Sequence, residues 1–191
     1  MADSKTSIRT FTGRRFDILE PRALDVNIKD IAHALSLLCR FTGHVNQFYS
    51  VAQHSLIVSS KMPREFRLWG LLHDATEAYV ADMSRPLKHA PEMSRYRTAE
   101  KNVLREICRR FSLKLPEPPE VKEVDRRMCA TEMRDLMGGI YGEGILPYPE
   151  QVIPVSSAIA EAMFLERYYE LRYESIFDRP RSNQLTSLNA R

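Results

Sequence analysis

Residues 50–80 decide the fold, and they read SVAQHSLIVSSKMPREFRLWGLLHDATEAYV. Ser50 and Gln53 have the spacing of a capping box, so a helix is expected to begin here and to run to about Ser60. Pro63 fits the first position of a second helix, because a proline there loses no helical hydrogen bond. The second helix is rich in leucine and aromatic residues, which predicts a buried face. The stretch therefore predicts two packed helices, each with a histidine among apolar residues.

Helical spacing of apolar residues continues on both sides of this stretch. Helices are expected at residues 27–40, 95–111, 121–136 and 157–173, with Asn27 as the N-cap of the first. Residues 8–19 carry a Thr12-Gly13 turn between two short apolar segments, which predicts a hairpin. The predicted fold class is all-α with a small N-terminal β-hairpin. Residues 1–176 are predicted to form a single domain, and residues 177–191, which are polar and without periodicity, a flexible C-terminal tail.

Composition places the chain among ordinary globular proteins. Of 191 residues, 43% are hydrophobic and 28% are charged, so wholesale disorder is excluded. The net charge of +3 (28 Lys and Arg against 25 Asp and Glu) is too small to indicate stable nucleic-acid binding. Three widely spaced cysteines argue against a disulfide framework or a thiolate zinc site. The N-terminus has no signal-peptide core and no segment has the length of a membrane span, so a cytoplasmic protein without membrane contact is expected.

The strongest local chemical signal is the dipeptide His73-Asp74, on what is expected to be an apolar helix. Glu77 follows one turn later, on the same helical face. Asp82 lies just beyond the expected end of the helix. Burying this much negative charge is costly unless a cation neutralises it. The spacing therefore favours a divalent metal.

His54 and Asp125 are polar residues on helix faces that are otherwise apolar. Each has an ordinary explanation, since a lone helical histidine is commonly packed or exposed, and Asp125 has arginine neighbours with which to pair. Together with His73 and Asp74, however, they would form a site of two histidines and two aspartates. Such nitrogen and oxygen ligands suit Mn²⁺, Fe²⁺, Co²⁺, Ni²⁺ or Zn²⁺, and Mg²⁺ less well. The sequence predicts one divalent metal ion and does not determine which.

The order His, His-Asp, Asp on a helical chain resembles the HD-domain metal-dependent phosphohydrolases. Residues 48–55 (FYSVAQHS) and 72–79 (LHDATEAY) are similar to the nucleotidase branch, which includes bacterial 5′-deoxynucleotidases, prophage HD hydrolases and a cyanophage dATP triphosphohydrolase. The resemblance covers about residues 8–170 and is most specific over residues 40–88. It implies an HD-domain helical bundle, a hydrolase of nucleotide metabolism and a homo-oligomer, a dimer or larger.

The resemblance also implies roles for individual residues. The four metal ligands would be His54, His73, Asp74 and Asp125. Glu77 would position or deprotonate the attacking water, and Asp82 would assist near the scissile phosphate. The phosphate-binding residues would be Arg40, Lys88 and Lys122, although cations at such positions are commonly just solvated.

Two nucleotide substrates are compatible with this residue set. The leading hypothesis is a 5′-deoxynucleotidase that releases phosphate from deoxynucleoside monophosphates, for which Arg40 suffices as the phosphate-binding cation. The alternative is hydrolysis of a deoxynucleoside triphosphate to nucleoside and triphosphate, which Lys88 and Lys122 would favour.

Two alternatives lie outside nucleotidase chemistry. The first is a phosphodiesterase or alarmone hydrolase that uses the same metal core. Binuclear HD phosphodiesterases need additional histidines between His73 and Asp125, and His89 is the sole histidine in that interval. A non-catalytic protein that binds nucleotide and metal would not need the extra carboxylates of Glu77 and Asp82. Both alternatives remain open at the level of sequence.

Overall fold

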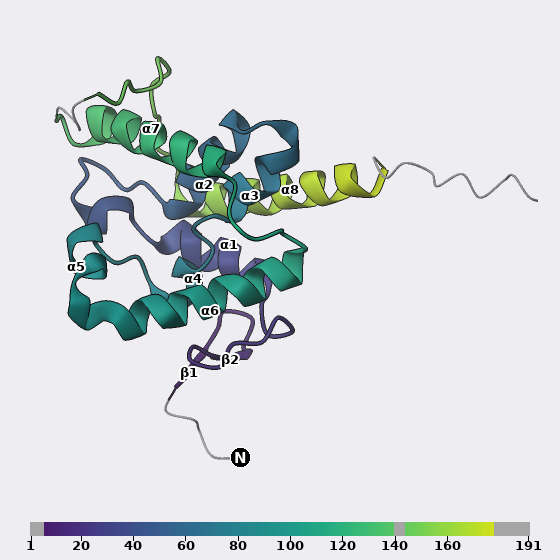
Figure 1. The fold of residues 1–191 in the computed structure, drawn as a ribbon. Helices are drawn as coiled ribbons and strands as arrows, with labels where there is room; N and C mark the ends of the chain where they lie inside the picture. The colour runs from purple at the N-terminus through teal and green to yellow at the C-terminus, as the bar shows by residue number, and fades with distance from the viewer. Residues whose placement is uncertain (1–5, 140–143, 178–191) are drawn as a thin grey trace, which may run out of the picture.

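The computed structural model describes residues 6–139 and 144–177 and shows a mainly helical chain (Figure 1). The eight α-helices of these residues are α1 (Ile28–Leu37), α2 (Val51–Lys61), α3 (Arg67–Leu72), α4 (Glu77–Val80), α5 (Arg85–His89), α6 (Ser94–Phe111), α7 (Pro119–Leu136) and α8 (Ser157–Phe177). Short 3₁₀ turns occupy Arg40–Gly43, Arg64–Phe66 and Pro91–Met93. The predicted mainly α-helical class is confirmed. Of the tail predicted for residues 177–191, Phe177 is the last residue of α8, and residues 178–191 lie outside the described residues.

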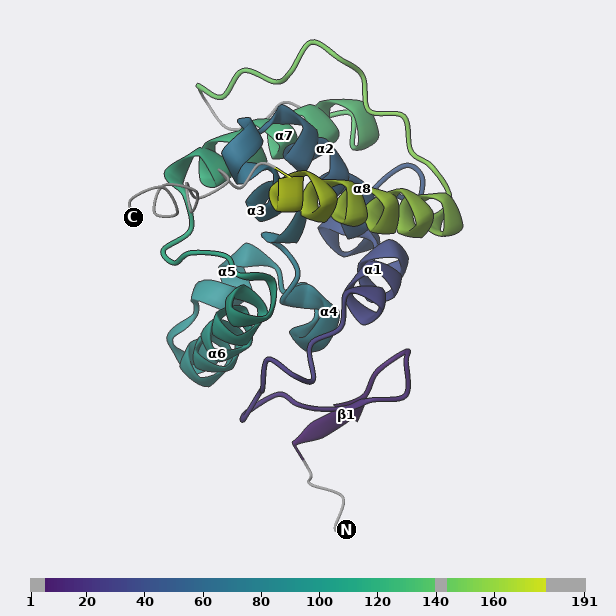
Figure 2. The same cartoon turned by 90° about the vertical axis from the view of Figure 1, so that its right-hand side faces the viewer.

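The predicted hairpin is confirmed. Strands β1 (Ser7–Arg9) and β2 (Arg15–Asp17) pair antiparallel, with Ile8 opposite Phe16. Gly13 adopts a φ of +79° in the connecting turn, a conformation that favours glycine. The Phe16 ring is fully buried and stacks on Tyr79 of α4, with ring centroids 3.9 Å apart. This contact fixes the hairpin against the helices, where Figure 2 shows it below α1 and α4.

The predicted helix caps form at both α1 and α2. The Asn27 side chain accepts a hydrogen bond from the Lys29 amide, and the Ser50 hydroxyl accepts one from the Gln53 amide at 3.1 Å. The Gln53 side chain does not complete a capping box. Its amide group instead bonds the backbone of residues 153 and 155, which ties the segment before α8 to α2. Helix α1 ends at Leu37, earlier than the predicted end near residue 40, because Arg40 begins a 3₁₀ turn.

Helix α2 is the centre of the molecule. It packs against α1, α3, α7 and α8, and both views show it enclosed by these elements (Figures 1 and 2). Its residues enter two hydrophobic clusters, one shared with α1 and α8 and the other shared with α6 and α7. Side chains of α2 that face α3 or α7 are therefore removed from water, and His54 is one of them.

The prediction for the second helix is wrong at both of its ends. Pro63 precedes a 3₁₀ turn rather than starting the helix, and α3 ends at Leu72 instead of continuing through the His-Asp dipeptide. The Ala75 amide bonds the Leu72 carbonyl and the Glu77 amide bonds the Asp74 carbonyl, both at 3.0 Å, which is the tighter i to i+3 pattern. Helix α4 then begins at Glu77. In a regular helix, two adjacent side chains point about 100° apart. The tighter turn lets the side chains of His73 and Asp74 reach the same point.

The later helices agree closely with the predictions. Helix α6 begins one residue before the predicted start at residue 95, and α8 extends four residues past the predicted end at residue 173. Helix α7 includes all of residues 121–136. Among the helices described here, none has the length and apolar character that a membrane crossing requires.

Candidate metal centre

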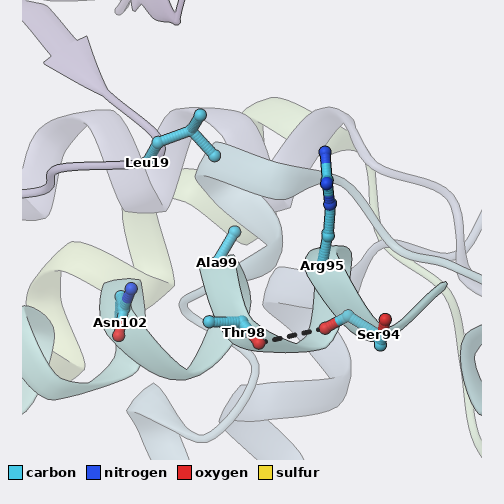
Figure 3. A pocket seen from close by; sticks show the side chains of 6 residues that line it. All are labelled: Leu19, Ser94, Arg95, Thr98, Ala99 and Asn102. Carbon is cyan, nitrogen blue, oxygen red and sulfur yellow. Dashed lines mark hydrogen bonds between the residues drawn. The ribbon is translucent and has the colours of Figure 1, made fainter.

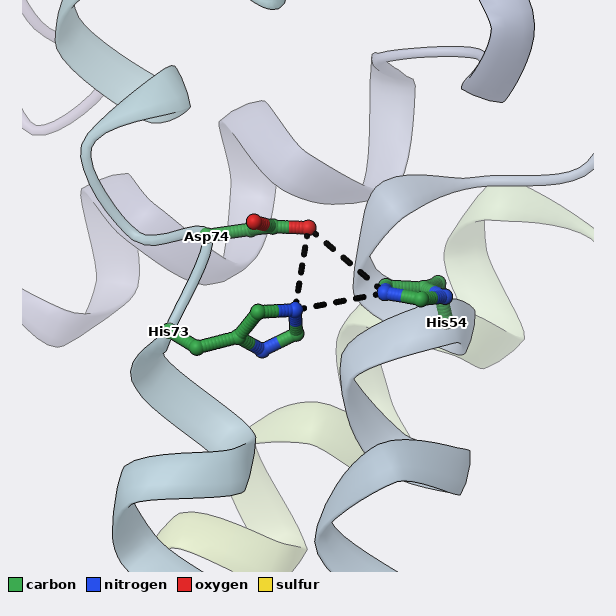
Figure 4. Close-up of side chains that lie close together, drawn as sticks. All are labelled: His54, His73 and Asp74. Carbon is green, nitrogen blue, oxygen red and sulfur yellow. Dashed lines mark hydrogen bonds and ion pairs between the residues drawn. The ribbon is translucent and has the colours of Figure 1, made fainter. Parts of the chain in front are cut away.

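Four predicted ligands come together from three parts of the fold. His54 projects from α2, His73 and Asp74 from the turn after α3, and Asp125 from α7. Figure 4 shows the first three pointing at one another. The Nε2 atom of His54 lies 3.2 Å from His73 Nε2 and 3.6 Å from Asp74 Oδ2, and His73 Nε2 lies 3.3 Å from the same oxygen. Asp125 Oδ1 lies 3.2 Å from His54 Nε2 and 3.9 Å from His73 Nε2.

These separations fit one metal ion. Nitrogen and oxygen ligands at roughly 2.1 Å from a metal lie roughly 3.0–3.5 Å from one another at octahedral or tetrahedral angles. The distances between donor atoms begin at 3.2 Å, and two, at 3.6 and 3.9 Å, are longer than this interval. In the part of the chain that the structure describes, the cluster that contains His54, His73 and Asp74 is also the one place where at least three such side chains have mutually close donor atoms. A single divalent ion is therefore the ligand that this geometry suits.

The histidine rings are oriented as metal ligands require. His73 Nδ1 lies 2.8 Å from the Gly70 carbonyl, and His54 Nδ1 lies 2.5 Å from a carboxylate oxygen of Glu132. Both partners are hydrogen-bond acceptors, so each Nδ1 carries the proton and donates it. In the neutral ring each Nε2 then presents its lone pair to the shared centre, as metal-bound histidines do. Lone pairs of nitrogen and oxygen converge on the same point, where a cation removes their mutual repulsion.

The charges of the cluster shift the protonation of its members. Burial lowers the pKa of His73, but the carboxylates of Asp74 and Asp125 outweigh burial and raise it to about 10. Burial raises the pKa of Asp74, but His73, His54 and Arg40 together outweigh burial and lower it. In the metal-free protein the centre therefore holds protons where a metal ion would bind, so metal and protons compete.

Access to the centre is one-sided. The His54 side chain is completely buried, whereas the Asp74 and Asp125 side chains are 20% and 28% exposed. Solvent and small molecules therefore reach the centre from the aspartate side, and the histidine side is sealed by the core.

Glu77 lies at the start of α4 and faces the same region. Burial, together with the negative charges of Asp74 and Asp82, raises its pKa well above the usual value for glutamate. Its Oε2 atom is buried and has no hydrogen-bond partner among the described residues. Asp82 is exposed and acts on Glu77 through its charge. Glu77 thus presents an unpaired acceptor beside the candidate metal ligands.

Arg40 reaches the centre from the 3₁₀ turn after α1. Its Nη1 atom lies 3.6 Å from Asp74 Oδ2, and its Nη2 atom lies 3.0 Å from Glu132 Oε2. The next two residues, Phe41 and Thr42, adopt φ values of 54° and 55°, which are strained for side chains of this kind. The two ion pairs hold the Arg40 guanidinium beside the candidate ligands, where the resemblance places a phosphate contact.

The two predicted lysines are placed less directly. Lys88 Nζ forms an ion pair with Glu100 of α6 at 2.6 Å, so this cation is engaged in the contact between α5 and α6. Lys122 is exposed on α7, one turn before Asp125. Lys122 acts electrostatically on Glu117, whose pKa is raised by burial and lowered by the charges of His73 and Lys122. The structure therefore joins Arg40 to the cluster and gives neither lysine a direct contact with it among the interactions described.

Two acidic residues of the region were missed by sequence reasoning. Glu132 is completely buried on α7, seven residues after Asp125 and therefore on nearly the same helical face. A glutamate in line with Met128 and Leu136 was a detectable signal, since charged residues are rarely buried without partners. Glu117 lies in the proline-rich connector before α7, where no periodicity pointed to the site.

Two concave surfaces lie elsewhere on the molecule. A shallow pocket of about 290 Å³ lies between Leu19 and the first turns of α6, and Figure 3 shows Arg95 as its one charged lining residue. A groove of about 830 Å³ runs between the Arg64–Phe66 turn, the segment before α7 and the end of α8. Neither surface is lined by a residue of the metal cluster.

Fold and cluster together define a mainly α-helical protein with a histidine and aspartate centre suited to a divalent metal ion. The chain is 38% identical over 172 residues to the protein YfdR of Escherichia coli K12, an alignment that spans 86% of the chain and 94% of YfdR. It therefore belongs to the family of YfdR. A second relative, the protein RCAP_rcc00048 of Rhodobacter capsulatus, is 42% identical over 91 residues, which is 43% of the chain and 46% of that protein. Both relatives are described as uncharacterized, and no protein-family model matches the chain.

Proposed function

We propose that this protein is a metal-dependent phosphohydrolase of the HD-domain class that cleaves the phosphate ester of deoxynucleoside monophosphates. The observation that carries the proposal is the convergence of His54, His73, Asp74 and Asp125, with both Nδ1 atoms facing acceptors. The order of these residues along a helical chain is the order that the resemblance to HD-domain proteins implies. Arg40 and Glu77 add a cation and a free acceptor at the same place.

A bound divalent ion supplies two things to such a reaction, namely polarisation of a phosphoryl oxygen and a lowered pKa for a water molecule. Arg40 would bind the phosphate, because its Nη1 atom has a long, weak contact with Asp74 that a phosphate oxygen can replace. Glu77 would hold the attacking water through Oε2 and accept its proton once the carboxyl is ionised. Asp82 would stay at the solvent-exposed rim and act on Glu77 through its charge.

The structure favours the monophosphate over the triphosphate as substrate. A triphosphate carries more negative charge than a monophosphate, and Lys88 and Lys122 are the predicted partners of the additional charge. Lys88 is already neutralised by Glu100, whereas Arg40, the cation needed for a monophosphate, contacts the cluster itself. Triphosphohydrolase activity is therefore the second candidate.

A diesterase with two metals has less support. Its extra ligand would be His89, whose Nδ1 bonds the Arg85 carbonyl at 2.8 Å on the exposed side of α5. Across residues 6–139 and 144–177, no second group of metal-binding side chains accompanies the cluster. A homo-oligomer and a cytoplasmic location stay predictions.

Product analysis tests the proposal. Metal-stripped protein is incubated with each deoxynucleoside monophosphate and triphosphate in the presence of Mn²⁺, Co²⁺ or Mg²⁺, and orthophosphate and triphosphate are measured separately. We expect metal-dependent release of orthophosphate from monophosphates. This release should be lost in Asp74→Ala and kept in the surface control Asp25→Ala. Asp25 is a suitable control because its carboxylate pairs with Arg22, outside the cluster. Absence of product from every nucleotide, with metal still bound, would refute the nucleotidase assignment.

A further inference from the structure

Glu132 is the most deeply buried carboxylate of the centre, and it is not a predicted metal ligand. Its side chain is 0% exposed and sits on α7, about two turns beyond Asp125. Oε1 accepts hydrogen bonds from His54 Nδ1 at 2.5 Å and from the Tyr49 hydroxyl at 2.9 Å. Oε2 accepts one from Arg40 Nη2 at 3.0 Å. One carboxylate thus contacts a candidate metal ligand and the candidate phosphate-binding cation with different oxygens.

A purely structural ion pair does not account for this arrangement. A buried pair such as Arg40 and Glu132 contributes little net stability, because desolvation of both charges offsets their attraction. A pair of that kind also needs no contact with His54. The Glu132 carboxylate, by contrast, fixes which nitrogen of His54 is protonated, since an ionised carboxylate only accepts hydrogen bonds.

We infer that Glu132 is the positioning residue of this centre, which holds His54 in the metal-binding tautomer and Arg40 at a fixed separation from the metal. The inference deepens the proposed function and rests on it for the role of Arg40. Rotation of the His54 ring would break the Oε1 contact, and movement of Arg40 would break the Oε2 contact. The α7 backbone joins both restraints to Asp125, a third member of the centre.

The variant Glu132→Gln keeps the shape of the side chain but makes its two polar ends different, because an NH₂ group replaces one of the two oxygens. If the amide oxygen faces His54, the amide NH₂ group faces the Arg40 donors and pushes them away. If the amide is reversed, the NH₂ group donates to His54 Nδ1, and the proton must move to Nε2, where it blocks coordination. Either orientation damages one of the two restraints, and the first also replaces the charge-assisted hydrogen bond to His54 with a weaker neutral one, so metal binding is expected to weaken in both. Loss of such an outer partner typically weakens metal affinity about 10- to 100-fold.

Cobalt binding provides a readout that does not depend on turnover. Metal-free wild type, Glu132→Gln and the control Glu106→Gln are titrated with Co²⁺ at one pH, and the visible absorbance of bound cobalt gives the dissociation constant. Glu106 is a matched control because it is also a buried helical glutamate, with partners Ala23 and Arg109 outside the centre. We expect Glu132→Gln to bind Co²⁺ about 10- to 100-fold more weakly and Glu106→Gln to bind it as wild type does. A folded Glu132→Gln protein with wild-type Co²⁺ affinity would overturn the inference.

A measurement on the unaltered chain keeps the inference testable if Glu132→Gln does not fold. Nitrogen NMR of the histidine rings in the Zn²⁺-loaded wild type should show His54 coordinated through Nε2, with a protonated Nδ1 in a hydrogen bond. Coordination through Nδ1, or an Nδ1 without its proton, would contradict the assignment. Wild-type protein that binds Co²⁺ but hydrolyses no nucleotide would refute the proposed function alone, because the Co²⁺ comparison and the ring assignment are unaffected by the substrate.

Discussion

Gly70 lies where α3 approaches the end of α2 closely, and replacing it with alanine is expected to disturb the metal centre. A Cβ atom at this position would lie 2.7 Å from Met62 Cγ and 3.0 Å from the Ser59 Cα atom. The Gly70 carbonyl also accepts the hydrogen bond from His73 Nδ1. Because the Ser59 contact is with backbone, relief of the clash requires α3 to move away from the helix that carries His54.

The expected loss of stability follows from two opposing effects. Overpacking a close contact costs about 1–3 kcal/mol, whereas alanine in a helix is about 1 kcal/mol more favourable than glycine. Gly70→Ala should therefore lower the free energy of unfolding by about 1 kcal/mol, which corresponds to about 2–4 °C in Tm for a chain of this size. Displacement of the carbonyl that orients His73 should also weaken Co²⁺ binding about tenfold, as loss of an outer partner does.

Thermal denaturation of the metal-free protein and Co²⁺ titration measure the two effects separately. If Gly70→Ala were more stable than wild type by the helix-propensity gain and bound Co²⁺ equally well, the close approach of α2 and α3 would not be what holds the centre together.

Three further results are expected. Co²⁺ affinity should rise about tenfold per pH unit from pH 6.5 towards 10, because His73, whose pKa is raised to about 10, must lose its proton before it binds metal; an affinity independent of pH would contradict this. Metal at 100 times its dissociation constant should stabilise the protein by about 2.7 kcal/mol, seen as a rise in Tm that Asp74→Ala does not show. Arg40→Ala should destabilise the protein by about 3–5 kcal/mol, since Glu132 loses its cation, and it should raise KM for monophosphates. Lys88→Ala should leave monophosphate turnover unchanged, because Lys88 pairs with Glu100.

Local signals were sufficient to predict most of the fold. Asn27 and Ser50 have side chains that can cap a helix only through contacts within a few residues, so their positions are readable from the sequence. The hairpin was predicted because the Thr12-Gly13 turn lies between two short apolar segments, and Gly13 supplies the positive φ that the turn needs. Such features depend on neighbours along the chain and not on the packing of distant elements.

The interruption after Leu72 could not be predicted in the same way. Residues 73–76 contain neither glycine nor proline, and each is compatible with a continuous helix. Ala75 and Thr76 are both buried, so packing against the rest of the molecule selects the tighter turn. Tertiary contacts of this kind override local helix preference.

The candidate site likewise has some residues that local sequence predicts and others that only tertiary contacts reveal. His54, His73, Asp74 and Asp125 were predicted because each places a polar group on an apolar face, and the structure brings them together. Glu132 satisfied the same criterion, but its partners lie about 80 to 90 residues away in the sequence, so no spacing rule connects it to His54 or Arg40. The ion pair that engages Lys88 is likewise a contact between two helices, α5 and α6.

The most direct test of the central claim is a crystal structure of the protein soaked in Mn²⁺, with anomalous diffraction used to locate the metal. We predict one anomalous peak per chain, at about 2.0–2.3 Å from His54 Nε2, His73 Nε2 and one oxygen each of Asp74 and Asp125. The Glu132 carboxylate should remain on His54 Nδ1 and outside the coordination sphere. An anomalous peak elsewhere, with these four side chains unliganded, would contradict the assignment of a metal centre to this cluster.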